Sequence, residues 1–210
     1  MTTEQYILQS ITPEDEVLRE LVRQTNLTTI HPRMLSGHLQ GELLRILTLI
    51  VAPKNVLELG TFTGYSAICI ARGLSEEAKI HTVDSNDELE HISSTFFQKA
   101  GVAKKIIQYY GRALDIIPSM KQKFELIFID ADKREYSQYY ESLFKYNLVE
   151  SGSLILADNV LWYGKVTEKP SPHDTQSQGI ISFNRLIAED TRVDKIILPL
   201  RDGLTLIRVK

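Results

Sequence analysis

Three oxygen-bearing side chains follow two apolar segments of the sequence. Asp130 comes directly after residues 126–129, and Asp158 and Asn159 come directly after residues 154–157. Hard oxygen ligands favour Mg²⁺, with Ca²⁺ or Mn²⁺ as alternatives, over zinc. Three such ligands leave about three of the six positions around Mg²⁺ free, and a catechol could chelate through two of them. Each acid alone could instead cap a helix N-terminus, but the set favours a metal site.

A turn with two glycines precedes these acids in the chain. Gly60 and Gly64 lie between the apolar run 55–59 and an expected helix, so the backbone can turn tightly and approach a ligand closely. The spacing differs from the dinucleotide fingerprint G-x-G-x-x-G. Glu58 would repel a pyrophosphate but suits a cationic ligand such as S-adenosylmethionine, which carries a sulfonium and an ammonium. The alternative is a purely structural turn with surface acids.

Two more side chains add to this set. Asp84 ends the next apolar run, 79–83, where a carboxylate can accept hydrogen bonds from both hydroxyls of a ribose. Lys133 lies three residues after Asp130. A nearby divalent cation and a cationic cofactor would favour its neutral amine, which could act as a general base. A solvated surface lysine is the alternative.

The elements that must position these side chains alternate between strand and helix. Apolar runs at 55–59, 79–83, 106–109, 126–129 and 154–157 are separated by helical patterns at 65–73, 88–99, 113–120 and 136–146. This alternation predicts βαβ units and a parallel sheet covered by helices on both faces. Because parallel strands end at the same edge, the acids after these strands should meet there.

The two ends of the chain depart from this alternation. At the N-terminal end, we expect one helix to begin at Thr12-Pro13, with Thr12 as its N-cap, and a second to cover 37–51. At the C-terminal end, residues 165–178 predict a mobile loop and 179–189 a helix. The last two strands, 193–198 and 204–209, are too close for a crossover helix and predict an antiparallel hairpin.

Composition sets the class of protein. The chain has 210 residues, 43% of them hydrophobic, and a net charge of −3, which predicts one globular domain over 1–210 and no strongly basic nucleic-acid footprint. The single cysteine, Cys69, lies in an apolar run and should be buried. No signal peptide or membrane span is visible, so we expect a soluble cytoplasmic protein without membrane partners.

With these residues in place, the chain resembles the cation-dependent O-methyltransferases, the family of catechol and caffeoyl-CoA O-methyltransferases and many small bacterial enzymes. The motifs that carry the resemblance are LELGTFTGYS (57–66), VDSND (83–87), FIDADK (128–133), ADNVLWYG (157–164) and PLRDGLTLIR (199–208). The resemblance implies the Rossmann-like class I methyltransferase fold. Its seven-stranded, mostly parallel sheet has the order 3-2-1-4-5-7-6 and an antiparallel last strand. Residues 1–34 resemble the family only as a helical cap, and a homodimer is also implied.

The resemblance also assigns site residues. It places the cofactor site at Ser36, Glu58, Gly60, Thr61, Ser66, Asp84, Ala113 and Asp130, the metal ligands at Asp130, Asp158 and Asn159, catalysis at Lys133 and Asp130, and the substrate ring at Trp162 and Tyr163. Gln40-Gly41-Glu42 departs from the family's pattern of an acid followed by Gly-Gln. Arg112 and Arg201 receive no role.

The function so implied is direct, in-line transfer of a methyl group from S-adenosylmethionine to one hydroxyl of a catechol-like aromatic, such as a catechol, a hydroxycinnamate or a caffeoyl-CoA ester. Some bacterial members of this family instead methylate hydroxylated uridine in transfer RNA, which is the nearest alternative. A non-catalytic module that binds S-adenosylmethionine is an alternative of another class. A nucleotide-dependent dehydrogenase would need the three-glycine fingerprint, which is absent.

Overall fold

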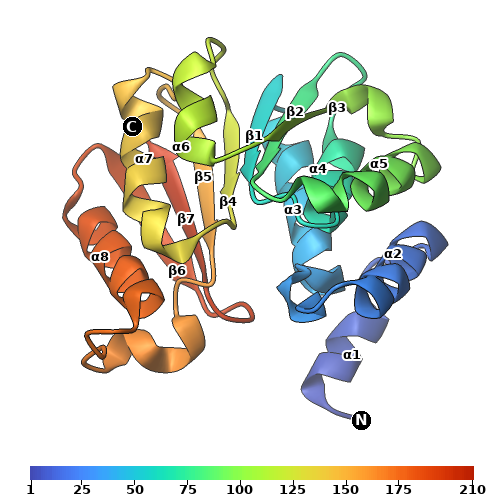
Figure 1. Cartoon of the computed structure of the whole chain (residues 1–210), viewed down its shortest axis with the longest axis horizontal. Helices are drawn as coiled ribbons and strands as arrows, with labels where there is room; N and C mark the ends of the chain where they lie inside the picture. The colour runs from blue at the N-terminus through green and yellow to red at the C-terminus, as the bar shows by residue number, and fades with distance from the viewer.

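A seven-stranded sheet forms the centre of the structure, a computed structural model that describes residues 1–210 (Figure 1). The strands are β1 (Asn55–Leu59), β2 (Lys79–Asp84), β3 (Ile106–Tyr110), β4 (Leu126–Ile129), β5 (Leu154–Asp158), β6 (Val193–Leu198) and β7 (Leu204–Val209). Their order is β3-β2-β1-β4-β5-β7-β6. Neighbouring strands from β3 to β5 are parallel, and β7 is antiparallel to both β5 and β6. The predicted fold class, strand order and closing hairpin are confirmed.

The register of the central strands brings their carboxyl ends level. Leu59 of β1 pairs with Ile129 of β4, and Ile129 in turn pairs with Ala157 of β5. The next residues along β4 and β5 are Asp130 and Asp158. The sheet register therefore places these two acids side by side.

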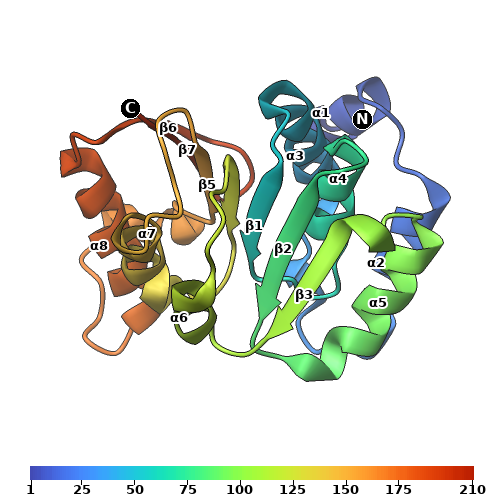
Figure 2. The same cartoon turned by 90° about the horizontal axis from the view of Figure 1, so that it is seen from above.

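Helices cover both faces of the sheet (Figure 2). One layer contains α2 (Glu16–Thr28), α3 (Gly37–Val51), α4 (Tyr65–Gly73) and α5 (Glu90–Lys99), and the other contains α6 (Ala113–Ile116), α7 (Tyr136–Lys145) and α8 (Thr175–Glu189). Successive side chains of a strand point to opposite faces, so Leu126 and Phe128 of β4 join one apolar core while Ile127 and Ile129 join the other. The sheet is thus buried on both sides.

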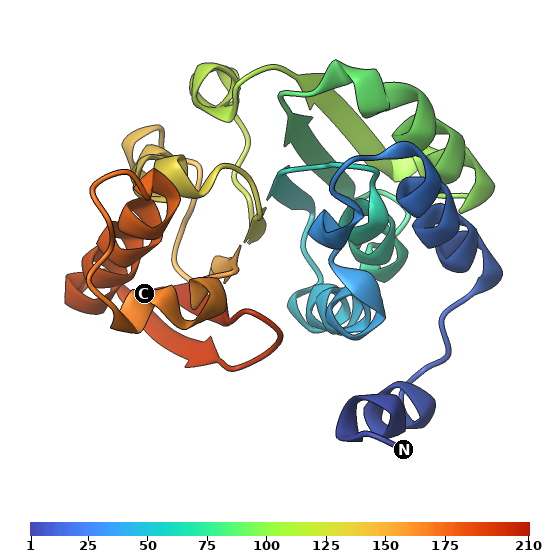
Figure 3. The ribbon, with the colours of Figure 1, turned by 60° about the horizontal axis from the view of Figure 1, so that its bottom comes forward.

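The N-terminal end differs from the prediction in two ways. A helix α1 (Thr3–Ser10), which the sequence analysis did not predict, has no buried side chain and stands away from the body (Figure 3). The next helix, α2, begins at Glu16 with Asp15 as its N-cap, so the predicted start at Thr12 was wrong. The Asp15 carboxylate accepts a hydrogen bond from the Leu18 N–H at 3.0 Å and also pairs with Arg72. These contacts explain why Asp15 caps the helix.

Three other boundaries also move. The predicted loop at 165–178 is helical at both ends, because η6 (Trp162–Thr167) enters it and α8 begins at Thr175, where Asp174 caps the Ser177 N–H. The predicted helix at 113–120 ends as α6 at Ile116 and continues as the 3-10 turn η4 (Ile117–Ser119), which contains Pro118, a residue without an N–H. A 3-10 turn, η2 (Asp87–Leu89), likewise precedes α5.

Two other expectations concern burial and membranes. Cys69 is buried and free, as predicted. No helix in the structure combines the length and the apolar character that crossing a membrane would need.

Candidate active site

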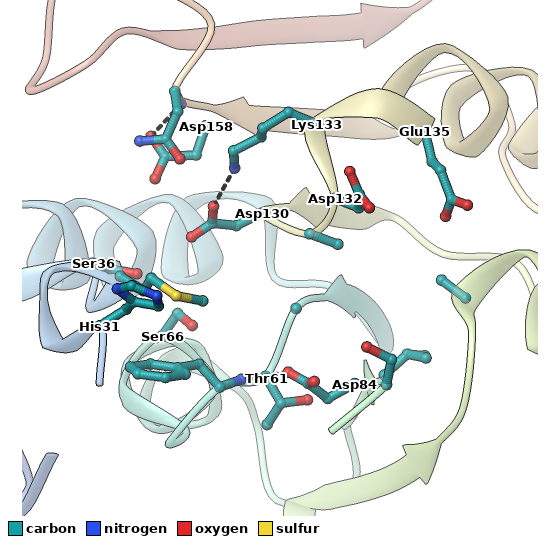
Figure 4. Close-up of a pocket in the computed structure, with 18 of the residues that line it drawn as sticks. His31, Ser36, Thr61, Ser66, Asp84, Asp130, Asp132, Lys133, Glu135 and Asp158 are labelled. Atoms are coloured by element: carbon teal, nitrogen blue, oxygen red, sulfur yellow. Dashed lines mark hydrogen bonds and ion pairs between the residues drawn. The ribbon is translucent and has the colours of Figure 1, made fainter. Parts of the chain in front are cut away.

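A cleft of about 1000 Å³ opens at the carboxyl ends of the central strands. It is lined by every site residue that the sequence analysis named except Glu58. These are Ser36, Gly60, Thr61, Ser66, Asp84, Ala113, Asp130, Lys133, Asp158, Asn159, Trp162 and Tyr163. Figure 4 shows Asp130, Lys133 and Asp158 on one side of the cleft and Thr61 and Asp84 on another. The fold therefore brings the predicted residues into one site.

Asp130 and Asp158 form an acidic pair on neighbouring strand ends. The Lys133 ammonium lies 2.7 Å from Asp130 Oδ1. Burial raises the pKa of Asp130 to about 6, and the charge of Asp158 adds to this rise against the opposing effect of Lys133. Two like charges this close disfavour ionisation unless a nearby cation offsets them.

The donor set at this pair fits a divalent cation with oxygen ligands. Asp130 and Asp158 contribute carboxylates, and Asn159 follows in a left-handed conformation, with φ of 57°. The Asn159 N–H donates to Asp158 Oδ1 at 2.8 Å, which fixes the orientation of that carboxylate. The candidate ligands are hard oxygen donors without histidine or cysteine among them, so they would suit Mg²⁺ better than zinc.

Gln40 is a site residue that sequence reasoning missed. Its side chain is buried on α3, and its Nε2 donates a hydrogen bond to Asp158 Oδ2 at 2.7 Å. The departure from the family pattern at Gln40-Gly41-Glu42 thus falls beside the acidic pair. The only signal in the sequence was that departure, since Gln40 and Asp158 are 118 residues apart.

The glycine turn brings the backbone at Gly60 close to the backbone at Asp130. Gly60 has φ of 102°, and a Cβ at this position would overlap the carbonyl oxygen of Asp130. The Gly60 N–H donates to the carbonyl of Val83, at the end of β2, at 2.9 Å. Gly64, with φ of 93°, is the N-cap of α4. The turn is therefore held tightly between β2 and β4, and its own backbone lines the cleft.

Asp84 holds the same turn from the side of β2. Its Oδ2 accepts a hydrogen bond from the Phe62 N–H at 2.7 Å, and its Oδ1 accepts one from the Asn86 N–H at 2.9 Å. Each carboxylate oxygen has a second lone pair, and Asp84 lines the cleft. It can therefore anchor the turn and still accept hydrogen bonds from a ligand.

Glu58 lies beneath the cleft and does not line it. Its side chain is fully buried, one oxygen accepts a hydrogen bond from the Thr82 hydroxyl, and the other, Oε1, has no partner. Burial raises the pKa of Glu58 to about 8, and the nearby hydroxyls of Ser66 and Thr82 oppose this rise. Its carboxyl therefore favours the neutral form in the ligand-free protein at neutral pH.

Glu58→Gln should change how stability depends on pH. Between the ordinary value of 4.5 and about 8, folded Glu58 keeps a proton that the unfolded chain has lost, so its contribution disfavours folding as pH rises. Glutamine cannot ionise, so the decline in the free energy of unfolding of the ligand-free protein from pH 5 to 8 should become shallower. Urea denaturation measures this decline. An unchanged slope, or an equal change in the exposed control Glu77→Gln, would contradict the prediction.

The wall of the cleft, including the segment after β5, contains strained backbone. Five non-glycine residues with positive φ, between 46° and 57°, line the cleft: Phe62, Asn159, Trp162, Tyr163 and Arg201. Such strain concentrates at functional sites. The Tyr163 N–H donates to Asp202 Oδ1 at 2.6 Å, which joins this wall to the β6–β7 turn.

The two arginines without a predicted role differ in what they contact. The Arg201 guanidinium lines the cleft and donates to the carbonyl of Leu35 at 3.0 and 3.1 Å, which links the β6–β7 turn to the segment before α3. Arg112 also lines the cleft, with its guanidinium 2.8 Å from Glu135. Arg201 therefore joins parts of the cleft that are distant in sequence.

The parallel sheet with a reversed last strand, and a cleft at its carboxyl ends, define a Rossmann-like methyltransferase fold. Residues 8–210 match the family described as O-methyltransferase. A caffeoyl-CoA O-methyltransferase of Eucalyptus gunnii is 37% identical over 97% of this chain and 86% of its own length. The chain belongs to the O-methyltransferase family, which confirms the resemblance.

Solved structures agree with this assignment. An O-methyltransferase from Bacillus cereus, solved with S-adenosylhomocysteine, is 31% identical with a TM-score of 0.89, covering 98% of this chain and 96% of its own. An O-methyltransferase from Streptomyces achromogenes involved in tomaymycin synthesis, solved with S-adenosylmethionine, is 29% identical with a TM-score of 0.90 over the whole of both chains. The fold and the family are thus shown by independent comparisons.

Proposed function

We propose that this protein transfers a methyl group from S-adenosylmethionine to one hydroxyl of a catechol-like small aromatic, with a divalent cation, Mg²⁺ first, at the acidic pair. One observation carries the proposal. Asp130 and Asp158 lie side by side at level strand ends, and Lys133 Nζ is 2.7 Å from Asp130 Oδ1. The glycine turn at Gly60 lies against Asp130. A metal, a base and a cofactor can therefore meet within one cleft.

The cofactor would lie along the glycine turn. In this arrangement Asp84 accepts hydrogen bonds from the ribose, and the buried hydroxyls of Ser36 and Ser66 contact the methionine end. Asp130 places negative charge near the sulfonium. The relatives solved with S-adenosylmethionine and S-adenosylhomocysteine support this cofactor.

Different side chains would bind the cation and accept the proton. A divalent cation held by Asp130, Asp158 and Asn159 would lower the pKa of a hydroxyl bound to it and fix its orientation. In its neutral form, Lys133 Nζ would take the proton of the acceptor hydroxyl. The oxygen would then form a bond to the methyl carbon in line as the methyl–sulfur bond breaks, which leaves S-adenosylhomocysteine. Holding two reactants in this alignment can recover about 7–11 kcal/mol of the barrier. Trp162 and Tyr163, whose rings are 5.6 Å apart, contribute aromatic surface for the acceptor ring.

The acceptor class is tested by a substrate panel with and without metal. We expect vicinal diols, such as catechols and hydroxycinnamates, to be methylated with Mg²⁺ and to lose most of the activity in excess EDTA. The matched monohydroxy compounds should react poorly, because one oxygen cannot chelate. Equal activity with EDTA would refute the metal proposal. Methylation of transfer RNA with a steep salt dependence would show that RNA, and not a small aromatic, is the acceptor.

We also propose a homodimer. The side chains of α1 are all unburied, and Leu49 and Ile50 of α3 are exposed by 52% and 72%, so apolar surface is available for a second copy. Light scattering on the purified protein should give the mass of a dimer, and the mass of a monomer would contradict the proposal.

A further inference from the structure

Tyr136 is a fully buried residue whose hydroxyl lies at the ends of two strands. It is the first residue of α7, directly behind the acidic pair. Its hydroxyl is 3.1 Å from the carbonyl oxygen of Ile129 and 3.0 Å from that of Asp158. It also accepts a hydrogen bond from Lys133 Nζ at 2.7 Å. One hydroxyl thus contacts β4, β5 and the proposed base.

These contacts lie at the point where the backbone pairing between β4 and β5 ends. The last β4–β5 pair is Ile129 with Ala157, so no β4–β5 pair joins Asp130 to Asp158, although Asp158 still pairs with Leu204 of β7. The Tyr136 hydroxyl spans this gap, since it can donate its hydrogen to either carbonyl. Its ring packs edge-on against Phe183, with centroids 5.4 Å apart, which fixes the position of the hydroxyl.

The same hydroxyl orients Lys133. The Lys133 amine donates both to Asp130 Oδ1 and to Tyr136, each at 2.7 Å, and also lies 4.9 Å from the centroid of the Tyr136 ring. Without the hydroxyl, the amine would keep Asp130 as its only side-chain acceptor and could rotate about that contact. A phenylalanine would retain the ring and its packing, and would remove only these hydrogen bonds.

We propose that Tyr136 is a positioning residue that sets the spacing of the Asp130 and Asp158 strand ends and aims Lys133 at the acceptor hydroxyl. This inference rests on the proposed function. Removing a residue that orients a metal ligand typically lowers metal affinity or activity by about 10–100-fold.

The test compares Tyr136→Phe with Tyr140→Phe. Tyr140 is equally buried on the same helix, and its hydroxyl donates to Asp190 Oδ2 at 2.8 Å, outside the cleft. Tyr136→Phe should weaken Mg²⁺ binding, measured by calorimetry without acceptor, by roughly 10–100-fold. It should also lower kcat at saturating Mg²⁺ while the KM for the acceptor stays near the wild-type value. Tyr140→Phe should lower stability but change neither quantity.

The outcomes separate this inference from the proposed function. If the wild type binds Mg²⁺ and both variants bind and turn over equally well, the positioning role is wrong and the proposed function stands. If the wild type binds no divalent cation, both fail. The concentration of folded protein is taken from its stoichiometry of S-adenosylhomocysteine binding. A variant that folds only in part is therefore still compared on its folded fraction.

Discussion

Asp158→Ala is expected to remove most of the metal-dependent methyl transfer while leaving the affinity for S-adenosylhomocysteine nearly unchanged. Asp158 is buried at the end of β5, next to Asp130, whereas the glycine turn at Gly60 and Gly64 lies on the other side of β4. A bound cation commonly supplies several kcal/mol to a transition state, so turnover should fall on the order of 10²- to 10³-fold. Turnover with saturating Mg²⁺ and calorimetry with S-adenosylhomocysteine measure the two effects.

The matched control is Asp194→Ala. Asp194 is an exposed acid near the start of β6, 3.7 Å from Lys210 and at the edge of the sheet opposite the cleft. It should leave both quantities unchanged. If Asp158→Ala kept full activity that still depended on Mg²⁺, the cation would have to bind elsewhere, and the acidic pair would lose its assigned role.

Lys133→Ala should lower kcat by about 10²–10⁴-fold, the range for loss of a general base, with little change in the acceptor KM. The reason is geometric, because Lys133 Nζ lies 2.7 Å from Asp130 Oδ1, on the cleft wall where the acceptor hydroxyl would bind. The lysine also lowers the pKa of Asp130, so its removal makes that carboxyl harder to ionise. A pH profile of kcat for both proteins separates the two effects, because a harder ionisation of Asp130 shifts the acidic limb of the profile.

Lys99→Ala controls for the loss of a lysine. Lys99 lies on α5, where its ammonium pairs with Glu20 at 2.5 Å on the surface. This variant should keep wild-type kcat. A Lys133→Ala enzyme with wild-type kcat and an unaltered pH profile would mean that solvent or another group accepts the proton.

Much of the scaffold could be predicted from the sequence. Strands β1, β4, β6 and β7 have the predicted bounds, and the reversed hairpin follows from the five residues between β6 and β7. The acids at the ends of β2, β4 and β5 share one edge of the sheet because parallel strands end there, which depends on the period of the apolar residues and not on distant contacts. The boundaries that moved, at Thr12 and in 165–178, depend on single caps such as Asp15 and Asp174.

The tertiary structure decided which residues surround that edge. Gln40 reaches Asp158 across 118 residues of sequence, and Arg201 reaches Leu35 across 166. In the sequence, Tyr136 is one of several aromatic residues in a helical pattern. In the structure, α7 packs behind β4 and β5 and places the Tyr136 hydroxyl between their ends. Glu58, which the resemblance predicts as a cofactor residue, is buried beneath the cleft. Local periodicity determines strands, turns and their shared edge, but the partner of a side chain depends on how separate elements pack, which no local pattern encodes.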